Sequence, residues 1–210
     1  HFPIPNITKS CSLIKRLLIQ TKKSKNKIYS LHEPEVVCIS KGKIHKRYEF
    51  GNKASFITTS KECFIVSANA LEGNPYDGHT LKDELLQAKR NIQPITSNSI
   101  ETLYTDKGYT GHGYEGTTTM LKETKSNRKK DKNLKRRSSI EPVISHLKQD
   151  HRLGRNFLKG THGDNINVIL SACGFNLKKI YNKLKKDWME SFFILFLLPF
   201  YCQREIHLVD

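Results

Sequence analysis

The segment Ile100-Glu-Thr-Leu-Tyr-Thr-Asp-Lys-Gly-Tyr109 brings a carboxylate, Asp106, directly behind a run of strand-forming residues. Ile100–Tyr104 is rich in β-branched and aromatic side chains, which are typical of a strand. Residues 107–119 follow with four glycines and several threonines, a composition typical of a loop. The segment therefore predicts a strand that ends at an aspartate.

A second carboxylate, Glu141, lies in the segment Arg137-Ser-Ser-Ile-Glu-Pro-Val-Ile-Ser-His-Leu-Lys148. Its apolar residues recur with a helical period, which predicts a helix over about Ile140–Gln149 with Ser139 as the N-cap. Proline is tolerated only in the first turn of a helix, so Pro142 places Glu141 near the helix start.

Glu141 also lies between two cations at helical spacing. Arg137 precedes it by four residues and Lys148 follows it by seven, close to one and two helical turns. This pattern suits a surface ion-pair ladder, worth about 0–1 kcal/mol. It suits equally a metal ligand between phosphate-binding cations, and the spacing alone does not choose.

The charge of the chain indicates a polyanionic partner. Among 210 residues, 36 Lys and Arg face 20 Asp and Glu, which gives a net charge of +16. Basic side chains that neutralise phosphates release condensed counterions, so nucleic acid is the expected partner. The five cysteines are scattered without a Cys-x-x-Cys pair, which predicts reduced thiols in a cytoplasmic protein rather than a disulfide framework or a zinc site.

The order of the remaining elements predicts a domain that mixes α and β. Two strands are expected over Tyr48–Thr59 and Cys63–Leu71, followed by a helix over His79–Arg90. A last helix, Asp164–Leu184, is expected to begin with Asp164 as its N-cap. Its apolar residues are Ile166, Ile169, Leu170, Cys173, Leu177 and Ile180.

The apolar stretch Phe192–Tyr201 is interrupted by Pro199 and is too short to span a membrane, which needs roughly 20 apolar residues. Three regions are therefore expected. Residues 1–27 form a linker or the remnant of an upstream region, residues 28–187 form the folded domain, and residues 188–210 form an apolar tail.

Two carboxylates from different elements can converge on divalent metal ions. Phosphodiester cleavage and strand transfer are well served by two metals about 3.5–4 Å apart, and magnesium prefers carboxylate oxygens with retained water. Asp106 and Glu141 suit two of the ligand positions.

Thr105–Tyr109 and the spacing of Arg137, Glu141 and Lys148 resemble the DDE transposases of bacterial insertion sequences. The family signature has a Tyr where this chain has Leu134. The resemblance covers about residues 27–185. Further segments that look like the same family are Tyr29–Glu35, Lys41–Lys43, Tyr48–Gly51, Gly73–His79 and Gly154–Asn156.

The resemblance implies an α/β fold, an RNase H-like mixed sheet flanked by helices, with a catalytic Asp, Asp, Glu triad. Asp106 matches the second Asp and Glu141 the Glu. Residues 1–30 contain no Asp or Glu, so the sheet is expected to lack its first strand and the chain to be the C-terminal part of a transposase. Asp77, in a dense turn cluster, is the candidate for a third carboxylate.

The implied cofactor is Mg²⁺ or Mn²⁺, held by Asp106 and Glu141, and the implied partners are the DNA of transposon ends and target. A homo-oligomer is left open, and no membrane is expected. Lys107, Arg137 and Lys148 would contact phosphates, which positions DNA without reading its sequence.

The implied reaction is cleavage of DNA at transposon ends followed by strand transfer. Activity of this chain alone is expected to be weak or absent, since two carboxylates leave one metal under-coordinated. Three alternatives remain open: a basic DNA-binding remnant without catalysis, a metal-dependent nuclease that uses Asp77, and a decayed reading frame whose product does not fold.

Overall fold

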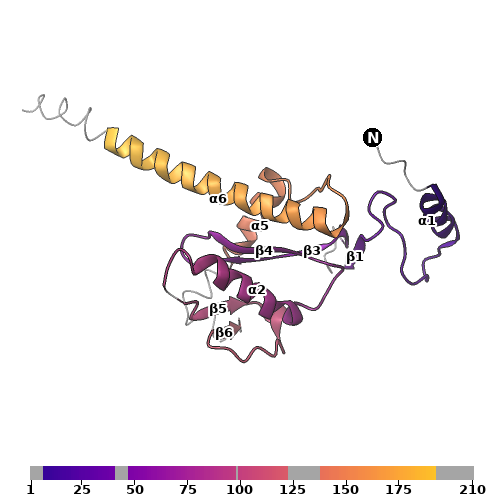
Figure 1. Ribbon diagram of the computed structural model, residues 1–210, viewed down its shortest axis with the longest axis horizontal. Coiled ribbons are helices and arrows are strands. Elements are labelled where there is room, and N and C mark those ends of the chain that lie inside the picture. The colour runs from indigo at the N-terminus through magenta and orange to yellow at the C-terminus, as the bar shows by residue number, and fades with distance from the viewer. Residues whose placement is uncertain (1–6, 41–46, 98, 123–137, 193–210) are drawn as a thin grey trace, which may run out of the picture.

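The computed structural model describes residues 7–40, 47–97, 99–122 and 138–192, and all structural statements concern these residues. They form a mixed α/β structure of helices and small sheets (Figure 1). Helix α1 (Ile7–Ile19) lies at one end of the molecule and buries none of its residues. A helix is thus present within the region predicted as a linker or remnant.

Strands β1 (Val37–Ser40) and β2 (Tyr48–Gly51) form an antiparallel pair. Strand β3 (Lys53–Thr58) follows after a single residue, so the continuous strand predicted over Tyr48–Thr59 is wrong. The strand is interrupted after Gly51, whose φ of 146° lies in a region that favours glycine.

Strand β4 (Ile65–Leu71) pairs antiparallel with β3, as the two strand-like runs predicted. The register shifts near Ile57 and Thr58, because Ile57 pairs with Ser67 whereas Thr58 pairs with Ile65. A bulge of this kind changes which face the following side chains occupy.

The β3–β4 hairpin forms the middle of three layers. One face contributes Ala54, Phe56 and Ala68 to a core shared with the helices α5 (Ile140–Asp150) and α6 (Gly160–Phe192). On the other face, Ser55 and Ser67 hydrogen-bond to side chains of helix α2 (Asp77–Ile92). Figure 1 shows the hairpin between α6 and α2. The core is completed by Ile65, Val143, Leu147, Val168, Ala172 and Phe175.

A second, parallel pair consists of β5 (Thr102–Thr105) and β6 (Thr119–Lys122). The prediction of a plain loop over residues 107–119 is wrong at both ends. A 3-10 turn, η1, forms at Lys107–Tyr109, and Thr119 already belongs to β6. The parallel strand was missed because Thr119–Lys122 is too short to show an alternating pattern.

Helix α5 starts where the sequence predicts, but Ser139 does not cap it. Its backbone is right-handed helical (φ −66°, ψ −14°), and its side chain makes no capping hydrogen bond. An N-cap side chain reaches the first free N–H groups from an extended backbone, which Ser139 lacks. Its Oγ lies instead 3.3 Å from Sγ of Cys63.

Asp164 is not the N-cap of α6 either, because the helix begins four residues earlier at Gly160. The Gly160 N–H donates to Glu33 Oε1 at 2.8 Å, so a distant carboxylate occupies the helix start. Asp164 accepts hydrogen bonds from the side chains of Asn52 and Asn156, each at 2.6 Å. It thereby ties the start of β3 to the loop before α6.

Helix α6 buries a different face from the one that its apolar residues mark. Val168, Ala172 and Phe175 lie in the core. On the same side, Asn165 and Asn176 hydrogen-bond to backbone groups of β4. The apolar residues that mark the predicted stripe lie outside this core: Ile166, Ile169, Leu170, Cys173, Leu177 and Ile180.

Within the described residues, no helix is both long and apolar enough to cross a membrane. The predicted tail, residues 188–210, begins inside α6, and its part beyond residue 192 lies outside the described residues.

Candidate functional site

Asp106 stands where the sequence predicts, directly behind β5 and exposed to solvent. The backbone N–H of Gly108 donates to its Oδ1 at 2.7 Å. This contact closes the turn in which η1 starts and fixes the carboxylate at the end of the strand.

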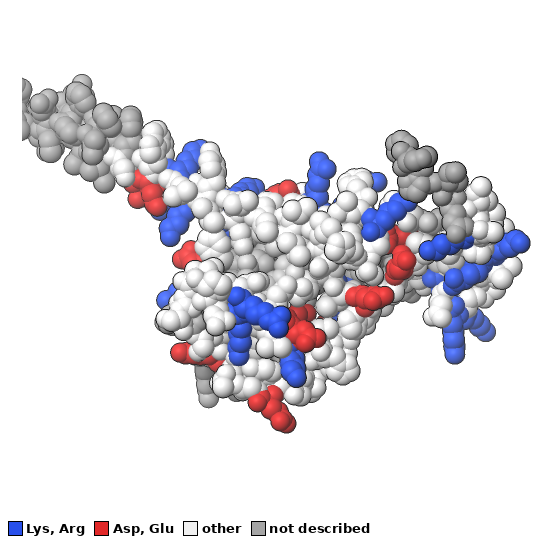
Figure 2. All heavy atoms as spheres, in the orientation of Figure 1, with Lys and Arg blue, Asp and Glu red and all other residues white. Residues whose placement is uncertain are grey.

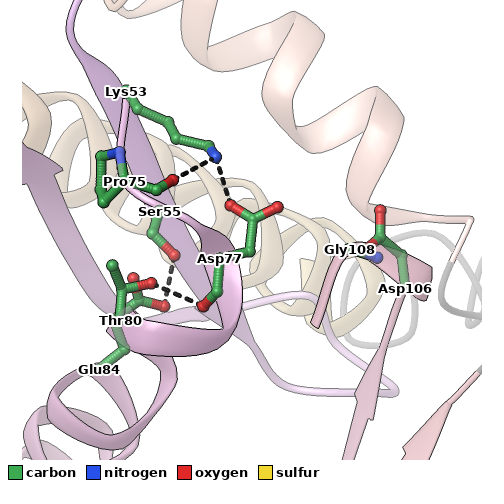
Figure 3. A network of polar contacts seen from close by, with 8 residues as sticks. All are labelled: Lys53, Ser55, Pro75, Asp77, Thr80, Glu84, Asp106 and Gly108. Atoms are coloured by element: carbon green, nitrogen blue, oxygen red, sulfur yellow. Dashed lines mark hydrogen bonds and ion pairs between the residues drawn. The ribbon is translucent and has the colours of Figure 1, made fainter. Parts of the chain in front are cut away.

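Asp77 is the first residue of α2, where the helix dipole favours a negative charge. Its Oδ1 forms an ion pair with Nζ of Lys53, at the start of β3. The same ammonium group donates to the carbonyl oxygen of Pro75 at 3.1 Å. Figure 3 shows this arrangement. Asp77 therefore has a structural role, and this role does not exclude a second role in catalysis.

The structure brings Asp77 and Asp106 together at Gly108 (Figure 3). A Cβ atom on Gly108 would lie 2.8 Å from Oδ2 of Asp77 and 3.0 Å from Oδ1 of Asp106. The two carboxylates consequently border one small space, which stays open because residue 108 has no side chain.

A buried acid, Glu84, lies on the same helix as Asp77. It is 3% exposed and accepts a hydrogen bond from Oγ of Ser55 at 2.5 Å, while its Oε1 has no partner among the described residues. Burial raises the pKa of Glu84, the hydrogen bond from Ser55 opposes that effect, and the Asp77 carboxylate adds to it. Glu84 is thus an incompletely satisfied acid beneath the aspartate pair.

Tyr109 belongs to the same group. Burial raises the pKa of its phenol to about 12, and the nearby carboxylates of Glu84, Asp77 and Asp106 add to the rise. The sequence interpretation missed both residues. A signal existed for Glu84, which shares the buried helical stripe of Leu81, Leu85 and Ala88.

These side chains line a cavity of about 580 Å³. Lys53, Asp77 and Asp106 lie on its wall, together with Glu84 and Tyr109. Helix α5 and the residue before it contribute Ser139, Ile140 and Ile144 but not Glu141, which is exposed in the first turn. The described residues hold no group of three or more His, Cys, Asp or Glu side chains that could bind a metal.

Of the three predicted phosphate contacts, the structure describes one side chain. Lys148 is half exposed, with its Nζ 3.9 Å from Oε1 of Glu49 on β2. The backbone of Lys107 lies in η1, but its side chain falls outside the described structure. Arg137 also lies outside the described residues.

Residues 109–181 match the family model of the transposase DDE domain. The transposase match includes Glu141 and Lys148 and starts three residues after Asp106. The chain matches no curated protein and no solved structure.

The two carboxylates next to Gly108 are donors of the kind that a divalent metal takes. Magnesium binds through one or two carboxylates, retained waters and substrate phosphates. Oδ1 of Asp77 forms the ion pair with Lys53, and its Oδ2 lies next to Gly108. Oδ1 of Asp106 lies next to the same glycine. One hard cation between the two aspartates is compatible with these contacts.

Proposed function

We propose that this chain acts in the transposition of an insertion sequence, by cleaving DNA at transposon ends and joining the cut strand to a target. The observation that carries this proposal is the transposase match over residues 109–181, which spans the Glu141 and Lys148 motif. The position of Asp106, just upstream of the match and behind a strand, supports it.

The fold proposed with this function is RNase H-like. Supporting features are an antiparallel hairpin, β3–β4, a helix that follows it, α2, and a parallel pair, β5–β6, with helices on both faces of the hairpin. Among the described residues, the hairpin and the parallel pair are separate two-stranded sheets.

In the proposed site, Asp106 and Asp77 would hold a Mg²⁺ or Mn²⁺ ion, and the ion would supply charge stabilisation to the phosphate. Lys53 neutralises Asp77 before the ion binds. Glu141, exposed at the start of α5, contributes only once DNA lies across the site. Lys107, Arg137 and Lys148 position the DNA backbone. Because the described residues bring only two acids together, we expect weak or absent activity from this chain alone.

DNA binding is proposed to use the basic segment around α1. Figure 2 shows Lys and Arg side chains gathered at this end of the molecule. The described part of residues 1–30 contains no acid to offset them. Its cations are Lys9, Lys15, Arg16, Lys22, Lys23, Lys25 and Lys27. Contacts of this kind bind phosphates without sequence preference and weaken with salt.

A second candidate, a metal-dependent nuclease that uses Asp77, is favoured by the approach of Asp77 to Asp106 at Gly108. It differs from the transposase proposal in the acids that it needs. A nuclease of this kind requires Asp77 and Asp106 and tolerates Glu141→Gln. The transposase requires Glu141 as well.

Nicking of supercoiled plasmid in Mn²⁺ by the purified protein tests the proposal. The variants are Asp106→Asn, Asp77→Asn and Glu141→Gln, with Asp83→Asn as control because Asp83 is exposed on the same helix as Asp77. Weak nicking that only Asp83→Asn retains supports the transposase. Retention in Glu141→Gln supports the nuclease, and DNA binding without nicking in any protein supports a binding remnant.

A further inference from the structure

Helix α6 carries an exposed row of apolar side chains, here called the α6 seam. Its members recur at alternating intervals of four and three residues, which is the a/d repeat of a coiled coil. All six are exposed, and the three leucines are 63%, 64% and 62% exposed in chain order. The α6 seam consists of Ile166, Leu170, Cys173, Leu177, Ile180 and Leu184.

The α6 seam and the core-facing residues of α6 occupy opposite sides of the helix. Val168, Ala172 and Phe175 lie in the core, and each follows a residue of the seam by two positions. Two positions correspond to about 200° around an α-helix. One side of α6 therefore packs on the domain, and the other side presents a second apolar surface.

The spacing of the seam indicates what kind of surface it fits. Figure 1 shows the C-terminal half of α6 extending past α5 and the sheets, and every residue from 181 to 190 is exposed. In folded proteins, a contiguous exposed apolar surface marks an interaction site. The alternation of four and three residues is the spacing at which side chains of one helix fill the holes of another. The seam is therefore suited to a second helix.

The α6 seam is complementary to itself in the antiparallel direction. In an antiparallel helix pair, each a residue lies opposite a d residue of the other helix. When two α6 helices cross at residue 175, every layer pairs a leucine with an isoleucine or a cysteine, and no polar residue enters the seam. A two-fold axis then generates six layers from three pairs. These pairs are Ile166 with Leu184, Leu170 with Ile180, and Cys173 with Leu177.

The distribution of charge along α6 favours the same orientation. Residues 176–192 carry five lysines and two acids, whereas residues 160–175 contain no Lys or Arg. A parallel pair would bring two lysine-rich halves together, and this repulsion opposes pairing. An antiparallel pair places each lysine-rich half beside a half without lysine, and it also aligns the two helix dipoles favourably. The lysines are Lys178, Lys179, Lys183, Lys185 and Lys186.

We propose that α6 pairs antiparallel with α6 of a second copy of this chain, through the α6 seam. Because the other side of α6 already packs on β4 and α5, the helix is folded before it pairs, and association costs little in ordering of the chain. The two domains lie on the outer sides of the helix pair. No residue of α6 lines the cavity next to Asp77 and Asp106, so the inference stands apart from the proposed function.

Sedimentation velocity of the full chain tests the pairing. The wild type should sediment as a dimer, with twice the monomer mass of 24.2 kDa. Leu177→Glu, near the centre of the seam, should weaken self-association at least tenfold. Ile95→Glu is the matched control, because it replaces an apolar residue that is 84% exposed outside α6, and it should dimerise as the wild type does. Circular dichroism checks that both variants fold.

The dependence on salt separates an apolar interface from association through residual nucleic acid. Salt screens the repulsion between lysines, so the dimer should persist or become tighter as salt rises. Association bridged by nucleic acid would instead weaken steeply with salt. A dimer that is present only at low salt would therefore contradict pairing through the seam.

Disulfide cross-linking tests the orientation. A mixture of Ile166→Cys and Leu184→Cys proteins under mild oxidation should give dimers that are linked between positions 166 and 184, as identified by peptide mass spectrometry. Neither protein alone should form a disulfide between its two introduced cysteines, because the antiparallel arrangement separates them beyond the reach of the bond. A monomeric wild type at high concentration, equal self-association of Leu177→Glu and the control, or disulfides that join identical positions would overturn the proposal.

Discussion

Gly108 decides whether the two aspartates can share an ion. A Cβ at this position would lie 2.8 Å from Oδ2 of Asp77 and 3.0 Å from Oδ1 of Asp106. The absence of a side chain therefore leaves space between the two carboxylates. Gly108→Ala should therefore push the carboxylates apart and lower Mn²⁺ affinity at least tenfold, as measured by electron paramagnetic resonance. Gly154→Ala is the control, since its Cβ would come no closer than 3.4 Å to any neighbouring atom. Equal affinities in both variants would exclude a site at Gly108.

Glu84 makes the stability of the protein depend on pH. Burial raises its pKa above the unfolded value of 4.5, so the folded state holds this proton more tightly. Its contribution to stability is full below pH 4.5 and is lost as the pH rises through the folded pKa. Glu84→Gln should raise the free energy of unfolding at pH 7 and lose this advantage near pH 4, in urea titrations. A gain that does not vary with pH would contradict this assignment.

At single residues, the sequence predicted the position of Asp106 but not its neighbour. An aspartate behind a strand-forming run is a local pattern, whereas the approach of Asp77 depends on how α2 packs against β3. The N-cap predictions for Ser139 and Asp164 are wrong because a cap depends on backbone angles and on distant partners. Glu33, in a loop far away in the chain, accepts the hydrogen bond from the Gly160 N–H at the start of α6.

Among the elements, Asp164 links the first turn of α6 to the start of β3 and to the preceding loop. It accepts hydrogen bonds from Asn52 and Asn156, and bonds to a charged acceptor are worth about 1.5–3 kcal/mol each. Asp164→Ala should lower the free energy of unfolding by roughly 3–6 kcal/mol in urea denaturation. Asp150→Ala is the matched control, because exposed ion pairs such as those of Asp150 contribute little to stability. Similar losses in both variants would contradict the linking role.

Helices with a clear period were predictable, and the face that they bury was not. The sequence placed α2 and α5 within two residues of their ends. In α6, the side that faces β4 carries asparagines that bind its backbone, so the more apolar stripe remains outside the core. The hydrophobic periodicity of a helix does not reveal that the helix packs against a sheet edge whose backbone groups need hydrogen bonds. The short strands β1 and β6 were not predicted because four residues are too few for an alternation.

Across the whole molecule, the excess of basic residues predicts DNA binding that depends strongly on salt. Replacing Lys22, Lys23 and Lys25 together by alanine should weaken binding to unrelated DNA sequences alike. The slope of log K against log salt should become shallower by about 0.9 for each phosphate that the protein no longer neutralises, in fluorescence titrations. An unchanged slope would place the DNA elsewhere on the protein. A sequence-dependent decrease in affinity would contradict the proposed backbone contacts.

The sequence predicted a mixed α/β domain with a hairpin, the intervening helix and two C-terminal helices. The separation of the β3–β4 pair from the β5–β6 pair, and the cavity between them, depend on tertiary packing that local sequence patterns do not report. The resemblance pairs Glu141 with Asp106 from sequence motifs alone. In the structure, Glu141 does not line the cavity.

Mn²⁺ binding by the free protein, followed by electron paramagnetic resonance, tests most directly whether Asp106 and Asp77 form the metal site. The proteins compared are the wild type, Asp106→Asn, Asp77→Asn, Glu141→Gln and the control Asp83→Asn. We predict that the first two variants each lose at least tenfold in affinity, whereas Glu141→Gln and Asp83→Asn bind as the wild type does. Wild-type affinity in Asp77→Asn, or a loss confined to Glu141→Gln, would contradict a site built on the two aspartates.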